Sequence, residues 1–344
     1  MARAADDSPA FADHSPVVVA RAPLRVSLAG GGTDLPSYAR LHGGEVISFA
    51  IDRHVAVTVY PRSFDGRVRA CWDVAEQVSR AEELENRYAR EVLRRVGVSR
   101  NIQLASFADA PNGTGLGGSG AFTVALLHAL RQGTSPDQRA LAEEAAAVEM
   151  VDLARPVGKH DHYIAAFGGL RALHIGTDLT VTQEELTVSP ALAGYLRNDL
   201  LLFYTGVTRD AGHVLAAQSA RTSHGDPEAV ASLRAIHDAV ADMRKALEND
   251  SVWDIGPLLH RHWMNKRQLS GGVSSSRIDD LYRCAREAGS DGGKLLGAGG
   301  GGFLLISCRP GYAAQVRTAM LEAGTQELPF GIDKHGSRAT TLGP

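Results

Sequence analysis

A glycine-rich segment in the first half of the chain has the composition of a phosphate-binding loop. Residues 110–120 read Ala-Pro-Asn-Gly-Thr-Gly-Leu-Gly-Gly-Ser-Gly and separate a strand expected at 101–107 from a helix expected at 119–132. Glycines let the backbone approach a phosphate closely, and successive N–H groups can point into one concavity. The N-terminus of the following helix adds partial positive charge. The segment therefore predicts an anion site.

Two alternative roles for this loop stay open. Gly113, Gly115 and Gly118 satisfy the pattern G-x-G-x-x-G of dinucleotide-binding folds. That fold needs an acidic residue about 20 positions later, at the end of a second strand. Residues 133–145 are instead expected to enter a helix, and the sequence holds no Walker motif. The second alternative is a tight turn that packs the helix on a sheet and binds nothing.

The elements that must position this loop indicate an α+β protein. Strands are expected at 17–28, 45–51 and 54–60, whereas helices dominate after residue 119, so the two kinds of element come in blocks. At 344 residues the chain is long enough for two domains. We expect a disordered leader at 1–16, because it mixes Asp, Ser, Pro and Ala without an apolar core. The weakest composition break then divides an N-terminal domain, 17–190, from a C-terminal domain, 191–344.

Composition excludes several classes of function. Lys and Arg total 36 against 39 Asp and Glu, a net charge of −3, so the basic surplus of a nucleic-acid-binding protein is missing. No apolar run approaches the roughly 20 residues that a membrane span needs. The three cysteines, Cys71, Cys284 and Cys308, form neither a disulfide framework nor a metal-site spacing. The cysteines favour a cytoplasmic protein with reduced thiols, and the charge and the short apolar runs favour one that contacts neither nucleic acid nor membrane.

Most of the glycines above average usage lie in three segments, and these segments resemble the motifs of a known family. The chain has 37 glycines, and clusters at 30–32, 113–120 and 292–302 account for about the whole excess over average usage. The segments 21–34 (RAPLRVSLAGGGTD), 111–121 (PNGTGLGGSGA) and 294–303 (KLLGAGGGGF) resemble, in order and spacing, the three motifs of the GHMP kinases. This family resemblance runs from about Val18 to Arg338. It implies ATP and Mg²⁺, and a two-domain fold with an N-terminal domain like ribosomal protein S5 domain 2 and a ferredoxin-like C-terminal domain. The active site is then expected in the cleft between the two halves.

Further segments resemble one branch of the family. Residues 43–48, 158–163, 204–209 and 292–294 look most like members that phosphorylate the anomeric hydroxyl of D-glycero-D-manno-heptose 7-phosphate. That resemblance implies a 1,7-bisphosphate product that feeds the synthesis of nucleotide-activated heptose. Two alternatives remain: a kinase for another sugar or cyclitol, such as fucose or an antibiotic-pathway heptose, and a GHMP-fold regulator that binds a ligand without catalysis.

The resemblance also assigns donor-side residues. ATP is expected to bind Pro111, Gly113, Thr114, Gly115, Leu116, Gly117, Gly118, Ser119 and Gly120. Mg²⁺ is expected on the Ser119 hydroxyl and the Glu149 carboxylate, both hard oxygen ligands. The family usually has serine at both 118 and 119, and this chain keeps only Ser119. Without the resemblance, Ser119 is a helix N-cap and Glu149 an exposed helix carboxylate.

On the acceptor side, Asp161 matches the aspartate that takes the sugar hydroxyl proton, and Arg25 falls where relatives place a cation beside it. A nearby cation lowers the pKa of a carboxyl group and keeps it ionised. Asp161 alternatively is a carboxylate favoured by the dipole of its own helix. The family usually reads Lys-Gln-Asp-Gln here, whereas this chain has His160 and His162.

The remaining expectations concern the substrate. Asp34 resembles the aspartate that accepts sugar hydroxyls, although it could instead cap the next helix. Candidate cations for a substrate phosphate are Lys159, Arg209 and Lys294. The residues expected to bind substrate are Gly31, Gly32, Thr33, Asp34, Lys159 and Arg209. The expected partners are a sugar phosphate and ATP, and a homodimer is compatible with the resemblance.

Overall fold

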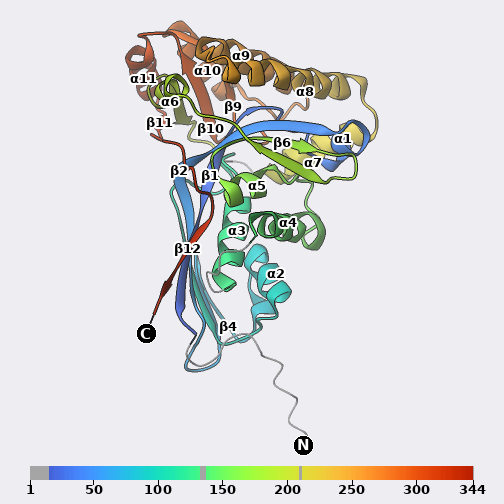
Figure 1. The fold of residues 1–344 in the computed structure, drawn as a ribbon, viewed down its shortest axis with the longest axis vertical. Coiled ribbons are helices and arrows are strands. Elements are labelled where there is room, and N and C mark those ends of the chain that lie inside the picture. Colours follow the sequence, from blue (N-terminus) through green and yellow to red (C-terminus); the bar gives the residue numbers. More distant parts are fainter. Residues whose placement is uncertain (1–14, 132–136, 209–210, 344) are drawn as a thin grey trace, which may run out of the picture.

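The computed structural model describes residues 15–131, 137–208 and 211–343 (Figure 1). Positions 1–14 of the predicted leader and the predicted substrate residue Arg209 lie outside the described residues. Strands and helices form two sheets with helices packed on them, so the predicted α+β class is confirmed. The division at residues 190 and 191 stays a prediction.

Among the described residues, the larger sheet has eight strands, built around the antiparallel pair β1 (Val17–Ala29) and β2 (Gly44–Tyr60). The first half of β2 pairs with β6 and its second half with β5. The last strand of the chain, β12, returns to this sheet and pairs antiparallel with β1, although it follows the second sheet in sequence. The other strands are β3 (Val68–Cys71), β4 (Ala75–Val78), β5 (Ile102–Ala108), β6 (Leu170–Ile175), β7 (Val181–Glu185) and β12 (Arg338–Leu342).

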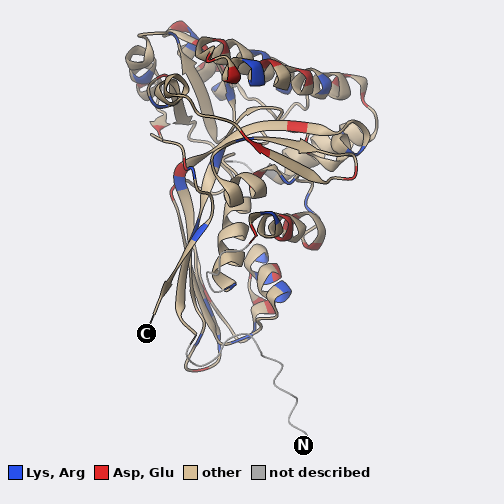
Figure 2. Ribbon diagram, viewed as in Figure 1, with Lys and Arg blue, Asp and Glu red and all other residues tan. Residues whose placement is uncertain are grey.

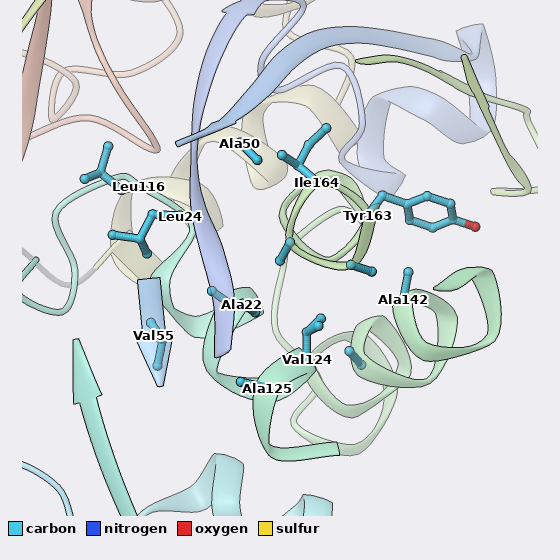
Figure 3. Packing of buried hydrophobic residues seen from close by; sticks show 14 of the residues in the cluster. Ala22, Leu24, Ala50, Val55, Leu116, Val124, Ala125, Ala142, Tyr163 and Ile164 are labelled. Carbon is cyan, nitrogen blue, oxygen red and sulfur yellow. The ribbon is translucent and has the colours of Figure 1, made fainter. Parts of the chain in front are cut away.

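Helices cover one face of this sheet. The predicted buried helix is α3, which is apolar nearly all round and packs on β1, β2, α4 and α5. Figure 3 shows side chains of these elements together in one cluster, with Val124 and Ala125 of α3 near Ala22 of β1. The helices of the first half of the chain are α1 (Pro36–His42), η1 (Ala81–Glu83), α2 (Arg87–Val96), α3 (Gly118–Leu130), α4 (Gln138–Ala147), the π-helical turn η2 (Val148–Asp152) and α5 (His160–Phe167). Of these, α1 packs on α7 (Ala211–Ser223).

The smaller sheet belongs to the second half of the chain and has the antiparallel order β11-β8-β10-β9. Its strands are β8 (Leu200–Tyr204), β9 (Ser290–Leu295), β10 (Phe303–Cys308) and β11 (Gln326–Glu327). Its helices are α6 (Pro190–Asn198), α7 (Ala211–Ser223), α8 (Pro227–Glu248), η3 (Val252–Asp254), α9 (Ile255–Lys266), α10 (Ser276–Glu287) and α11 (Ala313–Glu322). Helices α8 and α9 also contact β1 of the larger sheet, so they join the two layers.

Charged residues of both signs alternate along exposed helices such as α2 and α8 (Figure 2). Most of the long strands β1 and β2 are uncharged, as their burial requires. Within the described ranges, no helix is long and apolar enough to cross a membrane. The charge on these helices is thus mixed in sign, without a one-signed surface along them.

Candidate active site

A pocket of about 720 Å³ is lined by residues from both halves of the chain. The first half contributes β1, the loop after β5 and the start of α3, and the second contributes α7, α9 and the loop after β9. One part of the wall is apolar and includes the rings of Trp72 and Phe122, which meet edge to face with centroids 5.9 Å apart. Another part is strongly polar, with Arg25, Asp34 and Asp161.

The predicted phosphate loop lies on this pocket between β5 and α3. Gly113, Gly115 and Gly117 have positive φ values of 72°, 84° and 74°, which glycine adopts without strain. Gly117 occupies the N-cap position of α3, so Ser119 lies in the first turn and the N-cap alternative for Ser119 is wrong. All residues predicted to bind ATP line the pocket except Gly120, which packs against Asp161.

The third glycine cluster, 292–302, touches this loop backbone to backbone. A Cβ on Gly115 would lie 2.6 Å from the Leu296 carbonyl oxygen, and one on Gly297 would lie 2.4 Å from the Gly115 Cα. The Phe303 N–H donates to the Thr114 carbonyl at 3.1 Å. Side chains cannot fit between two chains this close, which explains why both segments are rich in glycine. The two halves of the chain therefore meet at the phosphate loop.

Arg25 and Asp161 form an ion pair beside the loop. The Nε of Arg25 donates to Oδ1 of Asp161 at 2.8 Å, and a Cβ on Gly117 would lie 3.2 Å from the Asp161 Cγ. Burial raises the pKa of Asp161, but the charge of the Arg25 guanidinium, the largest opposing effect, more than offsets this and holds the pKa below its ordinary value. The Asp161 side chain keeps 29% of its exposure. It is therefore an ionised carboxylate that a ligand in the pocket can reach.

Ser119 and Glu149 present two oxygens to the same pocket. The Ser119 hydroxyl donates to Oε2 of Glu149 at 3.4 Å, and Oε1 of Glu149 lies 3.1 Å from Nε2 of His162. Glu149 is buried, so the exposed-carboxylate alternative is wrong. It lies on the π-helical turn η2, a deviation that is frequent at functional sites. Burial lowers the pKa of His162, but the hydrogen bond and charge of Glu149 outweigh it and the pKa is raised.

Asp34 is buried at the polar end of the pocket and does not cap α1, whose N-cap position is Leu35. A Cβ on Gly158 would lie 2.1 Å from the Asp34 Oδ2, so only glycine fits there. Burial, and next the charge of Asp161, raise the pKa of Asp34 from 3.8 to about 6. The ionised Asp34 carboxylate therefore carries a desolvation penalty that hydroxyl donors from a ligand would relieve.

Some of the other residues predicted to bind substrate line the pocket, and others do not. Gly31 and Gly32 line the pocket with Asp34, whereas Thr33 is buried and bonds through its hydroxyl to the backbone of Gly30 and Glu45. The Lys159 Nζ donates to Glu143 at 2.6 Å, and Lys159 is not among the pocket's lining residues.

The two histidines beside Asp161 differ in their surroundings. His162 lines the pocket. His160 is buried and bonds to the Ser48 hydroxyl at 2.6 Å, and it is not among the lining residues. Burial, together with the charge of Arg25, lowers the pKa of His160 to about 3. His160 is therefore neutral at physiological pH.

Sequence reasoning missed several polar residues of the second half. Gln218 of α7, His262 and Lys266 of α9, and Lys294 of β9 line the pocket. Of these, only Lys294, within the third glycine cluster, is among the three candidate cations predicted for a substrate phosphate. The other three have no signal in the sequence, since each lies on a helix of ordinary mixed composition.

Two segments of the chain match known families. Residues 83–169 match the family described as GHMP kinases N terminal domain, and residues 243–326 match GHMP kinases C terminal. The chain belongs to the GHMP kinases. The predicted family and its two-domain α+β fold are therefore confirmed.

The chain is also similar to individual members of the family. A D-glycero-alpha-D-manno-heptose 7-phosphate kinase of Campylobacter jejuni is 25% identical over 336 residues, covering 92% of this chain and 97% of that protein. A bifunctional fucokinase/GDP-fucose pyrophosphorylase of Arabidopsis thaliana is 24% identical over 326 residues, which cover 87% of this chain and 30% of the relative. The crystal structure of a D-glycero-D-manno-heptose 1-phosphate kinase from Bacteroides thetaiotaomicron superposes with a TM-score of 0.77 at 22% identity, covering 94% and 99% of the two chains.

Proposed function

We propose that this protein is a sugar kinase that transfers the γ-phosphoryl group of ATP to the anomeric hydroxyl of D-glycero-D-manno-heptose 7-phosphate, giving the 1,7-bisphosphate. The observation that carries the proposal is the Arg25–Asp161 pair against Gly117 of the phosphate loop. A proton acceptor beside a phosphate cradle is the arrangement that phosphoryl transfer to a hydroxyl requires.

The donor side follows from the pocket wall. The positive-φ glycines of residues 113–117 and the N-terminus of α3 supply N–H groups and partial positive charge for the ATP phosphates. The apolar wall that contains Trp72 and Phe122 suits the nucleobase, since large flat side chains bury an aromatic ring well.

The metal ligands expected from the family fit the residues present. Ser119 and Glu149 both line the pocket, and their oxygens lie 3.4 Å apart, so the donor set consists of the hard oxygens that Mg²⁺ prefers. When bound there, Mg²⁺ would neutralise charge on the phosphate oxygens of ATP. His162 holds the second oxygen of Glu149 and so orients the carboxylate.

On the acceptor side, Asp161 takes the proton of the attacking hydroxyl at its free oxygen, while Arg25 holds Oδ1. Because the Arg25 charge keeps the pKa of Asp161 low, the carboxylate is ready to accept that proton at neutral pH. Asp34 would accept two sugar hydroxyls, which fixes the ring so that one hydroxyl faces the phosphate loop. The acceptor's identity is supported by the heptose 7-phosphate kinase of Campylobacter jejuni, which matches along nearly its whole length.

A second candidate is a kinase for a different sugar. It is favoured by the similarity to the fucokinase relative and by His162 in the pocket, where the family usually has glutamine. A GHMP-fold regulator without catalysis is disfavoured, because Ser119, Glu149 and Asp161 are all present and line the pocket.

A panel of acceptors tests the proposal. ATP consumption is measured with heptose 7-phosphate, the unphosphorylated heptose, fucose and galactose, each with and without Mg²⁺. The proposal expects the highest kcat/KM for heptose 7-phosphate. Preference for fucose would support the second candidate, and no consumption with any acceptor, together with tight ligand binding, would support the regulator.

A further inference from the structure

Two lysines line the pocket although both are nearly inaccessible to solvent. Lys294 is 1% exposed and Lys266 is 7% exposed. The Lys294 Nζ donates to the Ser27 hydroxyl and the Leu28 carbonyl, both at 3.2 Å. The Lys266 Nζ donates to the carbonyls of Leu295 and Gly297. An ammonium has three N–H donors, so each lysine keeps one donor beyond these bonds.

These cations have no carboxylate partner. Within the described part of the chain, neither lysine has an acidic group within 4.0 Å, and the charges that act most strongly on them are cationic. Burial, and next the charge of Arg25, lower the pKa of Lys266 to about 7, while burial and then Lys266 lower that of Lys294 well below its ordinary value. Buried lysines in proteins are normally paired with a carboxylate, so two buried lysines without an acidic partner on a pocket wall indicate an anionic ligand, whose charge would favour their protonated forms.

Two neutral side chains complete the cluster. Among the described residues, the Nδ1 of His262 and the Nε2 of Gln218 have no hydrogen-bond partner, and both side chains are 3% exposed and line the same pocket. Both lie against the first glycine cluster, 30–32: a Cβ on Gly32 would be 2.9 Å from the Gln218 Nε2, and one on Gly31 would be 4.0 Å from the His262 ring. We call Gln218, His262, Lys266 and Lys294 the buried lysine cluster.

The buried lysine cluster lies at a definite place along β1. Arg25, which holds the proposed base, and Ser27, which bonds Lys294, are two residues apart on this strand, a separation of about 7 Å. That separation is of the order of the length of one sugar ring with its exocyclic carbons. A sugar whose anomeric hydroxyl faces Asp161 would extend toward this cluster, with its ring beside Asp34.

We infer that the buried lysine cluster binds the phosphate monoester of the acceptor, and that it thereby selects a sugar phosphate over the same sugar without phosphate. The position of the sugar in this inference rests on the proposed function. The negative charge of the ligand is inferred independently, from the buried donors of the cluster that have no acidic partner. Lys266 and Lys294 neutralise the charge of the phosphate monoester, and Gln218 and His262 supply further hydrogen bonds to its oxygens.

Calorimetry without turnover tests the inference. The dissociation constants of heptose 7-phosphate, of the unphosphorylated heptose and of the ATP analogue AMP-PNP are measured for the wild-type protein, Lys294→Met and Lys266→Met. Gln218→Met is a milder variant that removes no charge, and Lys245→Met, on the solvent-facing side of α8, is the matched control. We expect Lys294→Met and Lys266→Met to weaken heptose 7-phosphate at least about tenfold, since a charge-assisted contact is lost. Gln218→Met should weaken it a few-fold, and AMP-PNP binding should stay unchanged.

Thermal unfolding separates binding from a structural role. Because burial without a carboxylate partner penalises the charged form of Lys294, replacing it by an apolar residue of similar size should keep or raise Tm without ligand. A lower Tm with unchanged affinity for heptose 7-phosphate would overturn the inference. A loss of affinity for AMP-PNP with unchanged affinity for heptose 7-phosphate would also overturn it, because it would assign the lysines to the phosphates of ATP. Equal affinity of the wild-type protein for the sugar with and without its phosphate would overturn it as well.

The inference can fail separately from the proposed function. If heptose 7-phosphate does not bind at all, the proposed substrate is wrong, and the cluster is probed with mannose 6-phosphate and inorganic phosphate on protein saturated with AMP-PNP. Stabilisation of the wild-type protein by these anions, absent in Lys294→Met and kept in Lys245→Met, would uphold the anion site. Equal stabilisation of all three proteins, or none, would overturn it.

Discussion

The guanidinium of Arg25 and the carboxylate of Asp161 are joined by a hydrogen bond of 2.8 Å although they lie 136 residues apart in the chain. Arg25 belongs to β1 and Asp161 to the first turn of α5, and both lie against the backbone of the phosphate loop at Gly117. Three distant segments therefore meet at the position where the proposed function places the γ-phosphate and the acceptor hydroxyl.

The first prediction concerns the proposed base. Asp161→Asn keeps the size of the side chain but removes its ability to take a proton, so kcat should fall at least about 10²-fold while the KM for ATP changes little. Steady-state ATP consumption measures both parameters. Asp238→Asn, at an exposed position of α8, is the control and should behave as wild type. Wild-type turnover in Asp161→Asn would rule out its role as base.

The second prediction concerns the metal. Ser119→Ala removes one of the two oxygens that lie 3.4 Å apart, so the Mg²⁺ concentration for half-maximal activity should rise about tenfold, the scale of one hydrogen bond or ligand contact to a charged group. A titration of activity against Mg²⁺ at saturating ATP measures it. Thr123→Ser, one turn further along α3 and bonded to the Ser119 carbonyl, should leave the midpoint unchanged. An unchanged midpoint in Ser119→Ala would remove Ser119 from the proposed ligands.

The third prediction is a pH dependence from Asp34. Its pKa is raised from 3.8 to about 6 in the folded protein, so between these values the folded state binds more protons and stability falls as pH rises. This difference corresponds to about 3 kcal/mol against the ionised form. Asp34→Asn should therefore raise Tm by a few degrees near neutral pH and leave it nearly unchanged below about pH 4. Thermal unfolding followed across this pH range measures the difference, and a Tm gain that is the same at every pH would contradict it.

The ionisation of Asp34 should also determine how the activity depends on pH. Sugar hydroxyls donate best to ionised Asp34, so wild-type kcat/KM for the acceptor should fall as pH decreases through about 6. Asp34→Asn should have a low acceptor kcat/KM without this acidic limb. A limb of the same midpoint in Asp34→Asn would assign the titration to another group.

The fourth prediction concerns the close approach of Gly158 to Asp34. A Cβ at 158 would lie 2.1 Å from the Asp34 Oδ2 and 2.6 Å from its carbonyl oxygen, so Gly158→Ala must displace Asp34. The acceptor KM should rise at least about tenfold while the KM for ATP stays near wild type. Gly194→Ala in α6, where nothing lies within 4 Å of the added Cβ, is the matched control and should keep both values.

Motifs with local physical meaning could be predicted from the sequence. The phosphate loop before α3 follows from glycines that must adopt positive φ next to a helix N-terminus, and the structure has both features. The proximity of Arg25 to Asp161 follows only from the family resemblance, because a sequence separation of 136 residues carries no local signal. The structure supplies the contact itself.

Features that depend on packing between the halves could not be predicted. Glu149 has the sequence context of an exposed helix residue, and the π-helical turn that buries it has no sequence signature. Gln218, His262 and Lys266 lie on helices whose inward face is decided only when α7 and α9 pack against the rest of the molecule. Lys159, expected on the substrate, is instead paired with Glu143, one helix away.

The most direct test of the central claim is a ³¹P NMR measurement of the product formed from ATP, Mg²⁺ and D-glycero-D-manno-heptose 7-phosphate. We expect ADP to appear together with an equal amount of a new anomeric phosphate signal, while the signal of the 7-phosphate is retained, and we expect neither change with Asp161→Asn. Absence of the anomeric signal with the wild-type protein, or its appearance at the wild-type rate with Asp161→Asn, would contradict the account.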